Sequence, residues 1–257
     1  MRRSIVPLLT TLAVLLFFYL PIAVLIVNSF NASRFGGSWG GFSLRWYVRL
    51  MHERDIWHAF RNTMLIATGA TLASTVLGST AAFALHRFRS RLQHIHYGLI
   101  YTPLVVPEIL MGMSLLLFFV ALNVQLGLFT IFLAHVTFCI SYVAMVVLAR
   151  LQDFDFAIVE AAMDLGANWW TTLWRVLVPL LAPGILAGGL LAFTLSIDDF
   201  VISFFVAGPG STTLPIRIYS MIKFGATPLI NALSTILLVF TFLIVWISQH
   251  LTKEHHA

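Results

Sequence analysis

Six long apolar stretches limit how this chain can fold more than any other feature of its sequence. An α-helix needs about 20 mostly apolar residues to cross the hydrocarbon core of a bilayer. The stretches that meet this requirement cover residues 8–29, 61–85, 98–122, 127–149, 180–206 and 229–250. We therefore expect an all-α membrane protein in which one transmembrane domain, residues 1–257, is built from six membrane-spanning helices.

The charge content supports this expectation and excludes a water-soluble fold. Hydrophobic residues make up 60% of the chain and charged residues only 10%, whereas an ordinary soluble domain is roughly 25% charged. The net charge of +5 does not indicate nucleic-acid binding, because the basic residues are scattered through the loops and form no stripe. Anionic lipid headgroups account for them instead. The single cysteine, Cys139, excludes an intrachain disulfide, and we expect it to serve helix packing.

The N-terminal stretch is expected to be retained as the first span. Its apolar run exceeds the roughly 7–15 residues of a signal-peptide core, and no A-x-A cleavage site follows. Lys and Arg divide almost equally between the two sides of the membrane and do not settle the orientation. Arg2 and Arg3, with Arg87, Arg89 and Arg91, closely flank the first three spans. Basic residues close to the first spans carry the most weight in the positive-inside rule, and these arginines therefore favour cytoplasmic N- and C-termini.

The segment between the first two spans reads as a membrane-interface element. Its aromatic and apolar residues recur with the spacing of an amphipathic helix, and such helices lie in the headgroup region with an aromatic belt. The residues concerned are Trp46, Tyr47, Leu50, Met51, Ile56 and Trp57.

The polar segment between the fourth and fifth spans, residues 152–179, has strong local signals. Asp155 can cap a short helix over 156–165, and Gly166 can end that helix with a left-handed residue. Asn168 can cap a second helix, which Pro179 follows. The sequence therefore predicts a helix, a turn and a second helix along the membrane face.

The same segment contains a spaced pattern: Glu160-Ala161-Ala162, then Gly166, then Val176, Val178 and Pro179. It resembles the EAA signature of the permease subunits of ABC importers, with Val in place of one Ile and one Leu. The resemblance implies the six-helix fold of the type I importer class and a cytoplasmic coupling helix that docks in a cleft of an ATPase subunit. The alternative is an amphipathic connector that has no partner. The coupling residues would be Glu160, Ala161, Ala162, Asp164, Gly166 and Pro179.

No catalytic machinery is recognisable in the sequence. The phosphate-binding pattern G-x-x-x-x-G-K-[ST] does not occur, so ATP and Mg²⁺ are expected on a separate ATPase subunit and no cofactor on this chain. The nine histidines are dispersed, and no metal-ligand set or paired nucleophile and base is apparent. We therefore expect a transport subunit and not an enzyme.

Three acidic residues lie inside the apolar stretches, where a charge is costly and points to function. Glu108 falls in the third, Asp198 and Asp199 in the fifth, and no Lys or Arg lies at a comparable depth. An acidic, unpaired interior suits a cationic solute. Neighbouring helical residues point about 100° apart, so one of the two aspartates is expected to be structural, and periodicity does not say which.

Aromatic residues near these acids suit a cation as well, because aromatic faces attract ammonium groups. The candidates on the solute pathway are Phe193, Phe200 and Tyr142. The alternative is that these rings face lipid or the protein core.

Several runs resemble the C-type permeases of spermidine/putrescine importers, over nearly the whole chain. They are Val27–Asn31, Ser33–Phe35, Ala134–Phe138, Ala192–Val201, Leu214–Pro215 and Ile218–Met221. The resemblance implies polyamine import across the bacterial inner membrane, with a periplasmic binding protein, a second homologous permease and two ATPase subunits. The alternatives are an importer of another organic cation and an ion-coupled secondary transporter, which would not need the coupling signature.

Overall fold

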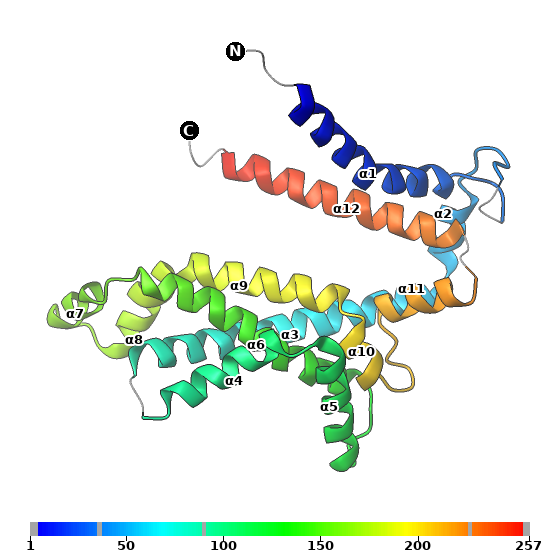
Figure 1. Cartoon of the computed structure of the whole chain (residues 1–257). Coiled ribbons are helices and arrows are strands. Elements are labelled where there is room, and N and C mark those ends of the chain that lie inside the picture. The colour runs from blue at the N-terminus through cyan, green and yellow to red at the C-terminus, as the bar shows by residue number, and fades with distance from the viewer. Residues whose placement is uncertain (1–4, 35–37, 89–90, 226–227, 254–257) are drawn as a thin grey trace. The chain divides into compact units, whose positions relative to one another are not determined.

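The computed structural model describes residues 5–34, 38–88, 91–225 and 228–253, and almost all regular structure there is helical (Figure 1). Apart from the helices, these residues contain an isolated bridge between Asn31 and Phe42. The helices in chain order are α1 (Ile5–Ser29), α2 (Arg45–His52), α3 (Arg54–Arg87), α4 (Gln93–Val105), α5 (Glu108–Ala121), α6 (Leu128–Gln152), α7 (Ala157–Asp164), α8 (Trp169–Thr172), the π-helical η1 (Leu173–Leu177), α9 (Val178–Asp198), α10 (Val201–Val206), α11 (Leu214–Lys223) and α12 (Pro228–Lys253).

The chain divides into two compact units, residues 1–57 with 217–257 and residues 58–216. In the first unit, α12 contacts both α1 and α2. The side chains of Trp46 and Leu50 on α2 are buried, and Trp46 donates from Nε1 to the carbonyl of Asn31. Of the other residues in the amphipathic pattern, Ile56 is also buried, whereas Met51 and Trp57 are exposed, so protein covers part of this apolar face and the membrane-interface role stays a prediction.

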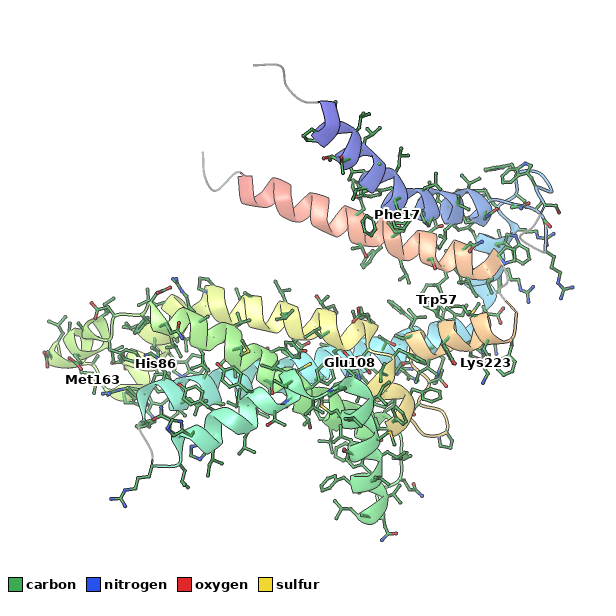
Figure 2. The ribbon with its side chains drawn as sticks, viewed as in Figure 1. Phe17, Trp57, His86, Glu108, Met163 and Lys223 are labelled. Carbon is green, nitrogen blue, oxygen red and sulfur yellow. The ribbon has the colours of Figure 1, made fainter. Side chains whose placement is uncertain are left out.

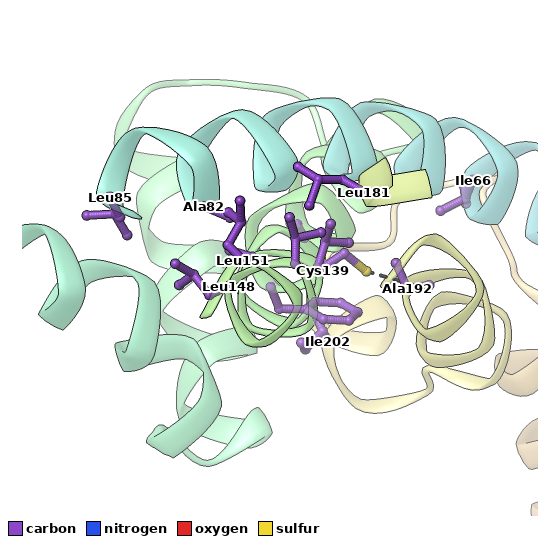
Figure 3. Packing of buried hydrophobic residues seen from close by; sticks show 14 of the residues in the cluster. Ile66, Ala82, Leu85, Cys139, Leu148, Leu151, Leu181, Ala192 and Ile202 are labelled. Atoms are coloured by element: carbon purple, nitrogen blue, oxygen red, sulfur yellow. Dashed lines mark hydrogen bonds between the residues drawn. The ribbon is translucent and has the colours of Figure 1, made fainter. Parts of the chain in front are cut away.

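The second unit is built around α6, which contacts α4, α5, α9 and α10. Its core joins buried residues of α3, α6, α9 and α10, and Figure 3 shows Cys139 on α6 against the carbonyl of Ala192 on α9, 3.6 Å from its Sγ. Glycines bring helices close to Val143: a Cβ at Gly78 would lie 2.8 Å from the Val143 Cβ, and one at Gly188 would lie 3.3 Å from its Cα. Small residues allow such close helix approach in membranes, where tight packing drives association.

Within the part of the chain that the structure describes, four helical stretches are long and apolar enough to cross a membrane, and they overlap four of the predicted spans. They are Pro7–Ser29, Arg54–Arg87, Leu128–Gln152 and Trp169–Asp198. The last predicted span lies within α12, of which Pro228–Phe242 forms an apolar helical part among the residues whose side chains are described.

The expectation of an uninterrupted helix over 98–122 was wrong. This range contains α4 and α5, which are bent by 111° relative to each other (Figure 1). Val106 and Pro107 between them are extended, with ψ of 128° and 136°. A residue before proline is disfavoured in the helical region, and proline offers no N–H to continue the hydrogen-bond ladder, so Pro107 accounts for the bend.

The predicted helix over 180–206 is also interrupted, because α9 ends at Asp198 and α10 begins at Val201. Asp199 is extended, with ψ of 121°. No proline lies at this break. Instead, the Asp199 carboxylate accepts from the backbone N–H groups of Ile202 and Ser203. Asp199 precedes the N-cap residue Phe200, and its carboxylate satisfies two of the backbone N–H groups that the first turn of α10 leaves free.

Candidate functional site

The α4–α5 bend and the α9–α10 break lie on one cavity of about 530 Å³ in the second unit. Five of the six predicted pathway residues line it, and Phe193, which is half-buried on α9, does not. The lining residues are Pro103, Leu104, Val105, Val106, Pro107, Glu108, Met111, Phe138, Tyr142, Leu195, Asp198, Asp199, Phe200, Val201 and Ile202. Residues up to almost 100 positions apart thus surround one space.

Glu108 is the first residue of α5 and its side chain is exposed (Figure 2). Its sequence position suggested the interior of a continuous span, but the bend places it at a helix N-terminus. The free N–H groups and the helix dipole favour a negative charge there. The chain can therefore keep a carboxylate at the cavity without a basic side chain beside it.

Asp198 and Asp199 differ sharply in their surroundings. Asp198 is the last residue of α9, is exposed and lines the cavity. The Asp199 side chain is only 6% exposed. Its Oδ2 lies 2.8 Å from the Ser203 backbone N and its Oδ1 lies 3.3 Å from that of Ile202. Both acids line the cavity, but Asp199 is buried and bound to backbone N–H groups, whereas Asp198 is exposed.

His135 on α6 is the partner of Asp199, and the expectation of an unpaired acid is wrong for that residue. The imidazole Nε2 lies 3.2 Å from Asp199 Oδ2, and the His135 side chain is 1% exposed. The same Nε2 lies 2.9 Å from Ser203 Oγ, and Nδ1 lies 2.7 Å from Ser196 Oγ. One buried ring therefore connects α6 with the end of α9 and the start of α10.

Sequence reasoning did not identify this network. One signal was present: a histidine in an apolar stretch needs polar partners, and Ser196 and Ser203 flank Asp199 at three and four residues. The sequence pattern does not show which of the dispersed histidines contacts these serines, because His135 is 61 residues from Ser196 and 68 from Ser203.

Two predicted aromatic residues also reach the cavity. Tyr142 lies on α6 and is half-buried, and Phe200 lies in the break between α9 and α10. The Phe200 ring packs on that of Phe204, with centroids 5.5 Å apart. The cavity wall thus combines carboxylates with aromatic rings, a pairing that suits ammonium groups.

The segment between α6 and α9 forms the second candidate site, and its local geometry largely follows the sequence signals. Asp155 Oδ1 accepts from the backbone N of Ala157 at 2.9 Å. Gly166 has a φ of +90°, and Asn168 caps the following helix by accepting from Thr171 N at 2.8 Å. The predicted helix, turn and helix are present. Pro179 departs from the prediction, because it lies in the first turn of α9 inside a helical run that continues from Trp169 to Asp198.

The turn presents apolar side chains outward. Leu165 is 90% exposed, Trp170 and Trp174 are largely exposed, and Met163 on α7 projects at the end of the unit away from Glu108 (Figure 2). Of the predicted coupling residues, Ala162 is half-buried, and Glu160, Ala161, Asp164, Gly166 and Pro179 are exposed. Exposed apolar clusters of this kind mark contacts with another protein or with lipid.

This segment is packed against the end of α3. The Phe83 ring lies 6.1 Å from that of Trp169 and 6.4 Å from that of Phe156, and the Arg87 guanidinium lies 5.8 Å above the Phe156 ring. A displacement of α7 and α8 would therefore act directly on a long helix of the same unit.

A family model and similar known proteins assign this chain to the same family. Residues 74–254 match the model of the binding-protein-dependent transport system inner membrane component family. The chain is 42% identical over 242 residues to the spermidine/putrescine transport system permease protein PotC of Escherichia coli, which covers 94% of this chain and 92% of that protein. It is 43% identical over 242 residues to the putrescine transport system permease protein PotI of the same organism, covering 91% and 86% of the two chains.

Solved structures show the same fold. A chain of a bacterial ABC transporter that imports the acidic polysaccharide alginate matches with a TM-score of 0.74 and 17% identity, over 97% of this chain and 98% of that chain. A chain of the MetNI methionine ABC transporter in an inward-facing conformation matches with a TM-score of 0.64 and 16% identity, over 78% and 97%.

Proposed function

The chain belongs to the family of binding-protein-dependent transport system inner membrane components, and from this premise we propose that it is the permease subunit of an ATP-driven importer of spermidine and putrescine. The observation that carries the proposal is the cavity in which exposed Asp198 and Glu108 meet Tyr142 and Phe200. The similarity to spermidine/putrescine and putrescine permeases over most of their length supports the same substrate class.

The charge of the cavity suits this substrate. None of the residues that line it is Lys or Arg, so the charged side chains that an anion would meet there are all acidic. A polyamine carries ammonium groups spaced along a flexible chain, and Asp198 and Glu108 come from separate elements, α9 and α5. Each can replace part of the hydration of one ammonium by a charge-assisted hydrogen bond, while the open cavity allows release.

The helix–turn–helix segment supplies the proposed link to ATP. In this proposal α7 and the turn at Gly166 dock on an ATPase subunit through Glu160, Ala161, Ala162, Asp164 and the exposed Leu165, on the cytoplasmic side. Closure of the ATPase pair would move α7 and α8, and the contacts of Phe156 and Trp169 with Phe83 would pass the movement to α3. ATP and Mg²⁺ belong to the partner, and this chain holds no cofactor.

We propose six membrane spans with both termini in the cytoplasm. Four are the long apolar helices, α4 and α5 together form one broken span, and α12 is the last. The complex in this proposal contains a second homologous permease, two ATPase subunits and a periplasmic binding protein that delivers the polyamine. The site lies in the bacterial inner membrane, surrounded by lipid.

Uptake by the reconstituted complex tests this function. Proteoliposomes that contain the chain, its partner permease and the ATPase, with binding protein outside and ATP inside, should accumulate labelled spermidine or putrescine. Omitting ATP should stop uptake, and dissipating ion gradients should leave it unchanged. Accumulation of another organic cation without polyamine uptake, or uptake driven by an ion gradient, would contradict the proposal.

A further inference from the structure

The buried network at the α9–α10 break assigns a role to a residue outside the cavity. We propose that His135 is a positioning residue for solute recognition, because it holds Asp199 at the start of α10 and thereby leaves Asp198 as the aspartate presented to the solute. This inference rests on the proposed transport of polyamines, and it concerns a side chain that does not line the cavity.

The ring of His135 is held at both nitrogens. An ionised carboxylate only accepts hydrogen bonds, so Nε2, 3.2 Å from Asp199 Oδ2, carries the proton. In the neutral ring Nδ1 then accepts from the hydroxyl of Ser196 at 2.7 Å. With Ser203 Oγ also 2.9 Å from Nε2, the ring has partners on both sides of the break. Such contacts fix its orientation and leave no ring nitrogen unpaired in a buried position.

This network determines where the chain leaves α9. Asp199 uses both carboxylate oxygens as a cap for α10 and meets His135 with one of them. Asp198 immediately precedes it and faces the cavity. A shift of Asp199 would turn Asp198 with it, because one peptide bond connects them. His135 also packs on Phe138, a cavity residue, with ring centroids 5.3 Å apart.

The consequence is a division of charge between two neighbouring acids. The carboxylate of Asp199 accepts hydrogen bonds from His135 and from backbone N–H groups, so in this proposal it does not bind the solute. The exposed carboxylates that remain on the cavity wall are those of Asp198 and Glu108. Their relative position, and therefore the preferred spacing between ammonium groups, depends on the geometry that His135 maintains.

Variants of His135 in the assembled importer test this role. His135→Leu keeps the approximate volume but donates no hydrogen bond, so we expect the KM for polyamine uptake to rise by about tenfold or more, with a smaller change in the maximal rate. Discrimination between diamines of different chain length should weaken. His135→Gln can still donate to Asp199 and should keep KM within about threefold of the unmodified complex.

A double variant separates positioning from general packing. His135→Leu leaves Asp199 as a buried charge without its ring partner, which is strongly unfavourable. Adding Asp199→Asn removes that charge, so the double variant should recover thermal stability and part of the KM, and the two changes should be clearly non-additive. Cys139→Ala is the matched control, because it alters a buried residue one turn further along α6 and should leave KM unchanged.

Three outcomes would overturn the inference. They are an unchanged KM and diamine selectivity in His135→Leu, independent multiplication of the two single effects in the double variant, and a loss of protein level and maximal rate in every His135 variant with KM unaltered. The unmodified complex separates this inference from the proposed function: if it imports no polyamine, the substrate assignment fails, whereas the stability coupling of His135 and Asp199 is measured without any solute.

Discussion

The two ends of the second unit depart from the usual distribution of side chains in opposite ways. Around the α9–α10 break, the Asp199 carboxylate and the His135 ring are buried among apolar helices, and their hydrogen bonds are satisfied within the protein. Around the turn at Gly166, apolar side chains such as Leu165 and Trp170 are exposed. In our proposal the polar groups placed inside serve a charged solute, and the apolar groups placed outside serve a partner protein.

The two ends also differ in what maintains their geometry. The turn is determined by neighbours in sequence: the cap at Asn168 and the positive φ of Gly166 involve residues within a few positions of each other. The break depends on a contact between α6 and residues more than 60 positions away. A change at the turn is therefore expected to disturb the fold only around α7 and α8, whereas a change at the break is expected to disturb the packing of α6, α9 and α10.

The largest effect is expected at the turn. Gly166→Pro cannot adopt a positive φ, because the ring fixes φ near −65°, and it removes the hydrogen bond from Gly166 N to Met163 O. We expect uptake to fall to background while the chain remains in the membrane, and co-purification of the ATPase to weaken. Glu160→Lys reverses the exposed charge of α7 and should act in the same direction. Normal uptake in both variants would remove the coupling role from this segment.

At the other end, Asp198→Asn keeps the shape of the side chain and removes its charge. Hydrogen bonds to charged groups contribute about 1.5–3 kcal/mol, so uptake at low polyamine concentration should fall by about tenfold or more. ATPase binding and thermal stability should remain unchanged, because Asp198 makes no structural contact comparable to that of Asp199. Equal uptake by the variant and the unmodified complex would refute a pathway role.

Glu108→Gln should lower uptake in the same direction but less, by about two- to fivefold. Its carboxylate lies at the start of α5, where the helix N-terminus already offsets part of its charge. Initial rates over a range of polyamine concentrations will show whether the effect is on KM. A loss larger than that of Asp198→Asn would reverse the order of the two acids.

The smallest effect on transport is expected from Asp199→Asn. Asparagine can still cap α10 and accept from His135, so uptake should change by about twofold at most. Thermal stability should decrease, and a loss of about 1 kcal/mol corresponds to roughly 2–4 °C for a chain of this size. Asp198→Asn serves as the comparison. If the Asp198 variant lost stability and the Asp199 variant did not, the assignment of the two acids would have to be exchanged.

Most features that depend on neighbouring residues could be predicted from the sequence. Features that depend on contacts between distant residues could not. Asp155, Gly166 and Asn168 were identified from rules about neighbouring residues, and the structure places them as those rules expect. The bend at Pro107 is also local, but the apolar pattern continues through it and concealed it. The positions of Glu108, Asp198, Tyr142 and Phe200 on one cavity follow from packing between helices.

The break at Asp199 shows why the remaining features were out of reach. In a continuous helix, periodicity assigns Asp198 and Asp199 to different faces without distinguishing their roles. The structure ends the helix between them, so the helical period no longer applies. The partner that decides the matter, His135, is one of nine dispersed histidines. Only the tertiary contact identifies it.

A structure of the assembled importer with spermidine bound would show which carboxylates hold the solute. We expect ammonium groups within about 3 Å of the carboxylates of Asp198 and Glu108, near the rings of Tyr142 and Phe200, with Asp199 still hydrogen-bonded to His135. Spermidine bound away from this cavity, or bound by Asp199 after its contact with His135 is broken, would contradict it.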